Sequence, residues 1–214
     1  KEQVLTSLGA ATSRLREKLG ESLASVRKFD VPLPRATTPS LDALHSYSLA
    51  LSEGLEVPRL EAIPHLKRAI ELDPTFAMAN ALLSGVYANN KQTALAPEYS
   101  RKAFELRDRV SERERFFISW RYYRDALQNW EKALDLSRPW AATYPRESVA
   151  FNAIGSAYIR LGQFEESIAP FREAIRLDPR FVPAYGNLAA SLLAVNRADD
   201  ARAIMNEVTR VKLL

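Results

Sequence analysis

The segment between residues 107 and 124 holds the densest group of side chains that could bind a ligand, because six arginines alternate there with five aromatic residues. Such a mixture can stack on the bases of single-stranded nucleic acid. However, four acidic residues in and beside the segment offset most of the positive charge, and the aromatic spacing is typical of a helix packed on both sides. We favour a structural role and keep a hot spot for a protein partner as an option. The residues are Arg107, Arg109, Arg113, Arg115, Phe116, Phe117, Trp120, Arg121, Tyr122, Tyr123 and Arg124.

Residues 122–129 are superficially similar to a protein-kinase catalytic loop. They lack its histidine, and only three residues separate Asp125 from Asn129. The sequence also contains no Gly-x-Gly-x-x-Gly, no Asp-Phe-Gly and no Gly-x-Ser-x-Gly motif. We therefore predict that no residue of this chain is catalytic and that the chain is not an enzyme.

Metal and cofactor chemistry has little support in the sequence. There are no cysteines, and the only histidines, His45 and His65, lie 20 residues apart without a third ligand at a compatible spacing. The pairs Glu165-Glu166 and Asp199-Asp200 are expected at helix starts, where acidic groups favour the positive end of the helix dipole. We predict no metal and no cofactor.

Composition indicates a globular helical chain, with 47% hydrophobic and 26% charged residues. No apolar run is long enough to insert this segment into a membrane. Of the net charge of +4, residues 1–40 contribute +3, with seven Lys/Arg against four Asp/Glu, so no basic stripe for nucleic acid is evident in the remainder. The start at Lys1, without a signal peptide, favours a segment of a longer protein.

A repeated hexapeptide sets the organisation of the chain. Ala69–Pro74 and Ala174–Pro179 are nearly identical and lie 105 residues apart, which is three periods of 34 plus three. A period in this range predicts an array of helix pairs. The extra residues fall at 111–113, and Ser111–Glu114 has the pattern of a capping box. The array 41–214 then divides into units 43–76, 77–110, 114–147, 148–181 and 182–214.

The residues before the array form a separate part. The spacing of apolar residues predicts an amphipathic helix over 3–19 within a helical extension 1–29, followed by a Pro/Thr linker 30–40. Ser40 is expected to cap the next helix. The extension either covers the first repeat, as solenoid ends require, or docks elsewhere or mediates dimerisation.

The fourth unit has small and bulky residues at fixed positions, namely Phe151, Ile154, Gly155, Tyr158, Gly162, Phe164, Ser167, Phe171, Ala174 and Pro179. In these residues it resembles the tetratricopeptide (TPR) repeat. The resemblance implies an all-α, right-handed TPR α-solenoid of about five helix pairs, in which small residues lie where two helices pack closely. The third unit departs from it, since Arg121 and Trp140 stand where small residues are expected.

In the TPR family the first helix of each pair lines a concave groove, which implies a peptide or partner site here. Some members bind a C-terminal carboxylate, but this chain has Asn152 and Ser156 where lysine and asparagine are expected, and only Asn187 matches. An extended peptide, or a loop or helix of a partner, remains open. The candidate groove residues are Arg115, Ile118, Tyr122, Asp125, Asn152, Ser156, Ile159, Arg160 and Asn187.

The stretches 15–29 and 107–114 are similar to segments of large bacterial multidomain signalling proteins, in which a serine/threonine kinase or a winged-helix domain often lies upstream. The resemblance implies a non-catalytic protein–protein interaction module, with any kinase activity in the upstream domain. A nucleic-acid-binding module and a self-assembly scaffold, joined through the N-terminal helix or the solenoid ends, are the alternatives. The location would be extracytoplasmic for a membrane-spanning kinase parent and cytoplasmic otherwise.

Overall fold

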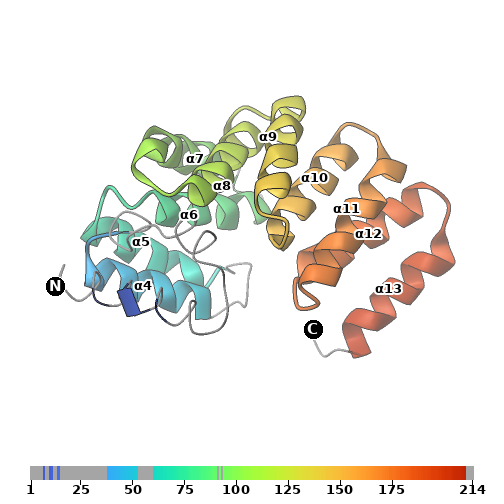
Figure 1. The fold of residues 1–214 in the computed structure, drawn as a ribbon, viewed down its shortest axis with the longest axis horizontal. Helices are drawn as coiled ribbons and strands as arrows, with labels where there is room; N and C mark the ends of the chain where they lie inside the picture. The colour runs from blue at the N-terminus through green and yellow to red at the C-terminus, as the bar shows by residue number, and fades with distance from the viewer. Residues whose placement is uncertain are drawn as a thin grey trace. The chain divides into compact units, whose positions relative to one another are not determined.

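The computed structural model describes residues 7, 10, 11, 14, 38–52, 60–90, 92 and 94–210. All regular structure in these residues is helical, and ten α-helices follow one another in pairs (Figure 1). The predicted all-α class is confirmed. The predicted helix over 3–19 and the linker 30–40 lie largely outside the described residues.

The chain forms two compact units, and the boundary between them falls within one helix, after Ile118. Unit 1 contains α4 (Leu41–Ser52), α5 (Ala62–Leu72), α6 (Ala77–Asn89), α7 (Leu95–Glu105), a 3₁₀ turn at Arg107–Arg109 and the first part of α8 (Glu112–Arg121). Unit 2 contains the end of α8, a π-helical turn at Tyr122–Ala126, α9 (Trp130–Thr143), α10 (Ser148–Arg160), α11 (Phe164–Leu177), α12 (Val182–Ala194) and α13 (Ala198–Arg210).

The two copies of the hexapeptide adopt the same turn. Helix α5 ends before Asp73, which has φ −145° and ψ 95°, and α11 ends before Asp178, which has φ −142° and ψ 95°. Each aspartate N–H donates to the carbonyl four residues earlier over 3.0 Å. Each carboxylate accepts the N–H two residues later over 2.9 Å. The repeated sequence therefore produces a repeated local structure, one in each unit.

Helix starts also follow the sequence pattern. The N–H of Ser111 donates to Glu114 Oε2 over 3.0 Å, and the N–H of Glu114 donates to Ser111 Oγ over 3.3 Å. This reciprocal pair is the predicted capping box at the start of α8. The N–H of Ala43 donates to Ser40 Oγ over 3.2 Å, which confirms the predicted cap of α4.

The core of unit 1 is built on large side chains that alternate with alanine. Phe76, Leu66 and Leu83 are fully buried. The Tyr47 ring lies 4.8 Å from that of Phe76, centroid to centroid. Burial raises the pKa of the Tyr47 hydroxyl, and the nearby Glu114 adds to the effect. The fully buried alanines that let the helices approach closely are Ala43, Ala50, Ala62, Ala69, Ala77, Ala79, Ala81 and Ala103.

The core of unit 2 depends on a glycine beside an aromatic ring. A side chain on Gly155 of α10 would place its Cβ 2.6–2.8 Å from three ring carbons of Phe171 in α11. Phe171, Leu188 and Leu192 are fully buried in one cluster. The close approach of α10 and α11 therefore requires the absence of a side chain at position 155.

The third helix pair contains the departures from the repeat pattern. Arg121 and Trp140 are both buried, with 8% and 2% of their surface exposed. The rings of Trp120 and Trp140 lie 6.4 Å apart. Directly after Arg121 the helix continues as the π-helical turn, which accommodates one more residue than an α-turn, and Gln128 then adopts a left-handed φ of 50°.

Within the described residues, no helix combines the length and the apolar character that crossing a membrane would require.

Candidate functional site

Two of the candidate groove residues lie in unit 1. Arg115 is exposed on α8. Ile118 is fully buried in a cluster with Ala77, Ala81 and Ala103. Ile118 therefore stabilises the core of unit 1 and presents no surface to a partner.

Asp125, in the π-helical turn of unit 2, binds two arginines of its own segment. Its carboxylate accepts from Arg121 Nη1 over 3.2 Å and from Arg124 Nε, and its side chain is only 3% exposed. The pKa of Arg121 is lowered to about 10, mainly by burial and also by the neighbouring Arg124, while Asp125 opposes the fall. This cluster holds the turn together, so Asp125 does not face a groove.

The aromatic residues of the same segment are buried or half-buried. Trp120 is 2% exposed, and the guanidinium carbons of Arg124 and Arg121 lie 4.8 Å and 5.4 Å from its ring centre. The rings of Tyr122 and Tyr123 meet edge to face at 5.5 Å, and both residues are half-buried. Trp120 thus offers no open face for stacking a base, which is what a nucleic-acid platform requires.

Two candidate asparagines meet across neighbouring first helices of unit 2. Asn187 Nδ2 on α12 donates to Asn152 Oδ1 on α10 over 3.0 Å. Asn152 is 8% exposed and Asn187 is half-buried. Each amide retains an N–H group and a carbonyl lone pair that this bond does not use. The pair can therefore bind a second amide, such as the main chain of a peptide.

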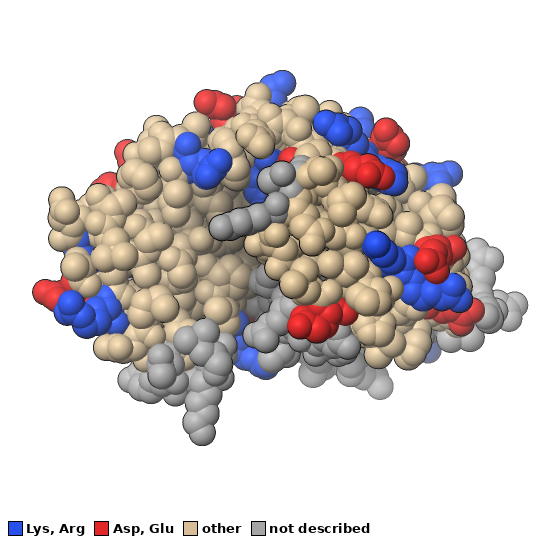
Figure 2. Space-filling view, turned by 180° about the vertical axis from the view of Figure 1, so that it is seen from behind, with Lys and Arg blue, Asp and Glu red and all other residues tan. Residues whose placement is uncertain are grey.

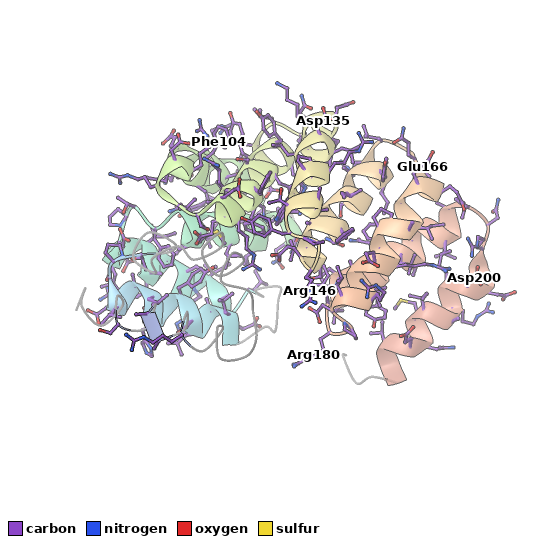
Figure 3. All side chains as sticks on the ribbon, viewed as in Figure 1. Phe104, Asp135, Arg146, Glu166, Arg180 and Asp200 are labelled. Carbon is purple, nitrogen blue, oxygen red and sulfur yellow. The ribbon has the colours of Figure 1, made fainter. Side chains whose placement is uncertain are left out.

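The first helices of unit 2 are almost uncharged. Helices α10 and α12, of 13 residues each, contain a single Lys, Arg, Asp or Glu, which is Arg160. The second helices carry the charge, and Figure 3 shows Asp135, Glu166 and Asp200 on the outside of α9, α11 and α13. In Figure 2 the part of the surface on the left, which belongs to unit 2, is mainly free of charged side chains, and charged groups lie along its margin.

Helix α12 adds an exposed stripe of small and apolar residues. Leu193 is 57% exposed, and Gly186, Ala190 and Ala194 are exposed at the three- and four-residue steps of one helix face. A Cβ on Gly186 would meet no atom within 4 Å. On α10, Ser156 is half-buried, and Ile159 is half-buried against the unit 2 core. The candidate site of unit 2 thus consists of an amide pair beside an open apolar strip.

Arg160 in the last turn of α10 stacks on Trp130, the first residue of α9, with its guanidinium carbon 5.2 Å from the ring centre. The sequence pattern did not point to Trp130. A contact between residues of different helix pairs, 30 positions apart, leaves no trace in the periodicity of either helix.

The part of the chain that the structure describes contains no group of three or more His, Asp or Glu residues able to hold a metal ion.

Comparison with known proteins agrees with this geometry. Residues 155–195, from the middle of α10 to the end of α12, match the family model described as TPR repeat. The structure is similar to TTC0263, a thermophilic TPR protein of Thermus thermophilus, with a TM-score of 0.54 and 16% identity over 80% of this chain and 96% of that one. No curated protein sequence matches the chain.

Two further solved structures extend the comparison. Human IFIT1, solved as a dimer with m7Gppp-AAAA, has a TM-score of 0.59 and 18% identity over 87% of this chain and 44% of that one. MamA from residue 41 to its end, from Desulfovibrio magneticus RS-1, has a TM-score of 0.46 and 20% identity over 81% of this chain and 96% of that one. The chain therefore carries TPR repeat sequence at residues 155–195, and its described helices have the fold of TPR proteins.

Proposed function

We propose that unit 2 binds an extended peptide segment of a partner protein along α10 and α12, without catalysis. The observation that supports this most is the hydrogen bond between Asn187 and Asn152, which fixes two amides side by side while leaving donors and acceptors for a peptide main chain. Main-chain hydrogen bonds supply affinity for extended peptides, and neighbouring side-chain contacts supply specificity.

The exposed strip on α12 supplies the second element of the proposed site. Leu193 and the small residues beside it offer apolar area without a competing charge. Burial of such area contributes about 25 cal/mol per Å². An uncharged surface with a fixed amide pair suits a peptide with apolar side chains, and TPR folds commonly serve as scaffolds for such partners.

The test uses the full chain and a displayed library of random peptides, each about 12 residues long, which is about twice the number of extended residues that match the length of a 13-residue helix. Selected peptides are synthesised with a fluorophore, and binding is measured by fluorescence polarisation. Asn187→Ala is expected to weaken binding about tenfold, because it removes the amide and leaves Asn152 without its partner. Asn206→Ala, which changes an exposed asparagine on α13, is the matched control. Failure to select any peptide, or equal affinity of the two variants, would contradict the proposal.

We further propose that the chain is the interaction part of a larger bacterial signalling or regulatory protein. The support is the resemblance of residues 15–29 and 107–114 to segments of such proteins. The gene that encodes the chain tests this directly. A kinase or winged-helix domain upstream of the segment is the expected result, and an open reading frame with neither would contradict it.

A further inference from the structure

We propose that the bound peptide carries an Asp or Glu side chain that pairs with Arg160. This inference rests on the proposed peptide-binding role of α10 and α12 and adds the chemical class of the ligand. Arg160 is exposed and is the one charged residue of these two helices.

The stacking contact orients the guanidinium of Arg160 without neutralising its charge. The guanidinium carbon lies over the Trp130 ring, 5.2 Å from its centre, and this contact with the ring uses no carboxylate, so the N–H groups stay available to one. Among the described residues, no carboxylate lies within 4.0 Å of Arg160, and none accepts a hydrogen bond from it. A planar guanidinium with a free edge is suited to bidentate contact with a carboxylate.

The arginines of the π-helical turn show the contrasting situation. Arg121 and Arg124 lie in the same unit, but both are already bound to the buried Asp125. The buried carboxylate of Asp125 therefore compensates their positive charge within the protein. Arg160 has an equivalent group with no carboxylate beside it in the described part of the chain, so a partner can supply one.

The position of Arg160 sets the spacing within the peptide. Arg160 follows Asn152 on α10 by eight positions, which corresponds to about 12 Å along the helix. An extended peptide advances about 3.3 Å per residue. The acidic residue is therefore expected about four positions from the residue whose main chain contacts the asparagine pair.

The experiment starts from the peptides selected on the full chain. Enrichment of Asp or Glu at one position is expected, and replacement of that residue by its amide should weaken binding about fivefold at low salt and less at high salt. Arg160→Gln should cause the same loss, and its effect should vanish on the amide peptide. Arg160→Glu should bind a peptide with Lys at that position better than the acidic peptide. Arg172→Gln and Arg172→Glu, at an exposed arginine of α11, are the matched controls.

The outcomes separate the two proposals. Peptides that bind, lose affinity with Asn187→Ala and show no acidic preference would overturn the role of Arg160 and leave the peptide site standing. Equal effects of the Arg160 and Arg172 variants on affinity would also overturn the role of Arg160, because the net charge of the protein, and not a contact with Arg160, would then explain the loss. If no peptide is selected, both proposals fail.

Discussion

The ring of Phe171 occupies the space that a side chain on Gly155 would need, with the nearest ring carbon 2.6 Å from the ideal Cβ position. Phe171 is fully buried, so its ring has little room to move away. This contact explains in physical terms why the pattern of small and large residues in the fourth unit has a glycine on the first helix and an aromatic residue on the second.

Gly155→Ala is expected to destabilise the chain by about 1–3 kcal/mol, the usual cost of overpacking a well-packed core. Urea unfolding followed by circular dichroism measures the change. Gly186→Ala is the matched control, because the same added methyl would meet no atom within 4 Å. That variant should be as stable as the wild type, or more stable by up to about 1 kcal/mol, since alanine favours the helix. Equal losses in both variants would contradict the packing argument.

Asp125→Ala is expected to destabilise the chain by about 3–5 kcal/mol, because it leaves the buried Arg121 without its carboxylate. The double variant Arg121→Met with Asp125→Leu removes both charges and should recover most of the loss. Both are measured by urea unfolding at neutral pH. A double variant that is as unstable as the single one would show that the ion pair has a role beyond charge compensation.

Tyr47→Phe is expected to reduce the dependence of stability on alkaline pH. The pKa of Tyr47 is raised in the folded protein by burial, above its ordinary value of 10.0. Its contribution is therefore complete below pH 10.0 and is lost as the pH rises further, because only the unfolded chain releases the proton there. Urea unfolding at about pH 8 and about pH 11, on either side of the ordinary tyrosine pKa, gives the slope. Tyr99→Phe, at a half-buried tyrosine of the same unit, is the matched control, and an equal change of slope in both variants would contradict the burial argument.

Glu114→Gln is expected to flatten the pH dependence of stability just above pH 4.5, the ordinary pKa of the group. Burial raises the pKa of Glu114, while hydrogen bonds from Ser111 and the charge of Arg113 oppose the rise. Since the pKa is raised, Glu114 contributes most below pH 4.5 and its contribution falls as the pH rises through the folded value. Gln keeps a capping-box acceptor without the charge.

Melting temperatures at about pH 4 and about pH 7, which bracket the titration of a raised glutamate, provide the measurement for Glu114→Gln. Relative to the wild type, the melting temperature of this variant should be higher at the neutral pH than its value at the acidic pH would predict. Glu112→Gln, at an exposed neighbour in the same helical turn, serves as the control. If both variants shift alike, the effect comes from net charge and not from the burial of Glu114.

Much of the fold could be predicted from local sequence. Ser111 and Glu114 form the predicted capping box because both partners lie within one helical turn. Asp73 and Asp178 end their helices in the same way because the turn depends on a few consecutive residues. The TPR resemblance placed Asn152 and Asn187 as candidates on successive first helices, and they do meet.

The candidate site was harder to predict, because burial and pairing depend on residues from other helices. Ile118 and Asp125 occupy positions that the repeat pattern assigns to the groove, yet Ile118 is in the core and Asp125 is bound by two arginines. The third helix pair carries the buried Arg121 and Trp140 in place of small residues. In this pair the position of a residue in the repeat does not predict whether its side chain is exposed.

Local sequence was sufficient for the helical class, the turns at the two hexapeptides and the capping of α4 and α8, since all of these arise from contacts within a few residues of chain. The packing of helices decided instead which charged and polar side chains pair with one another inside the protein. Packing joined Asp125 to Arg121 and Arg124, and it placed Arg160 on Trp130 with no carboxylate beside it among the described residues. A charged side chain is available to a partner only if folding brings no opposite charge to it. That outcome depends on residues far apart in the chain, so no local sequence pattern predicts it.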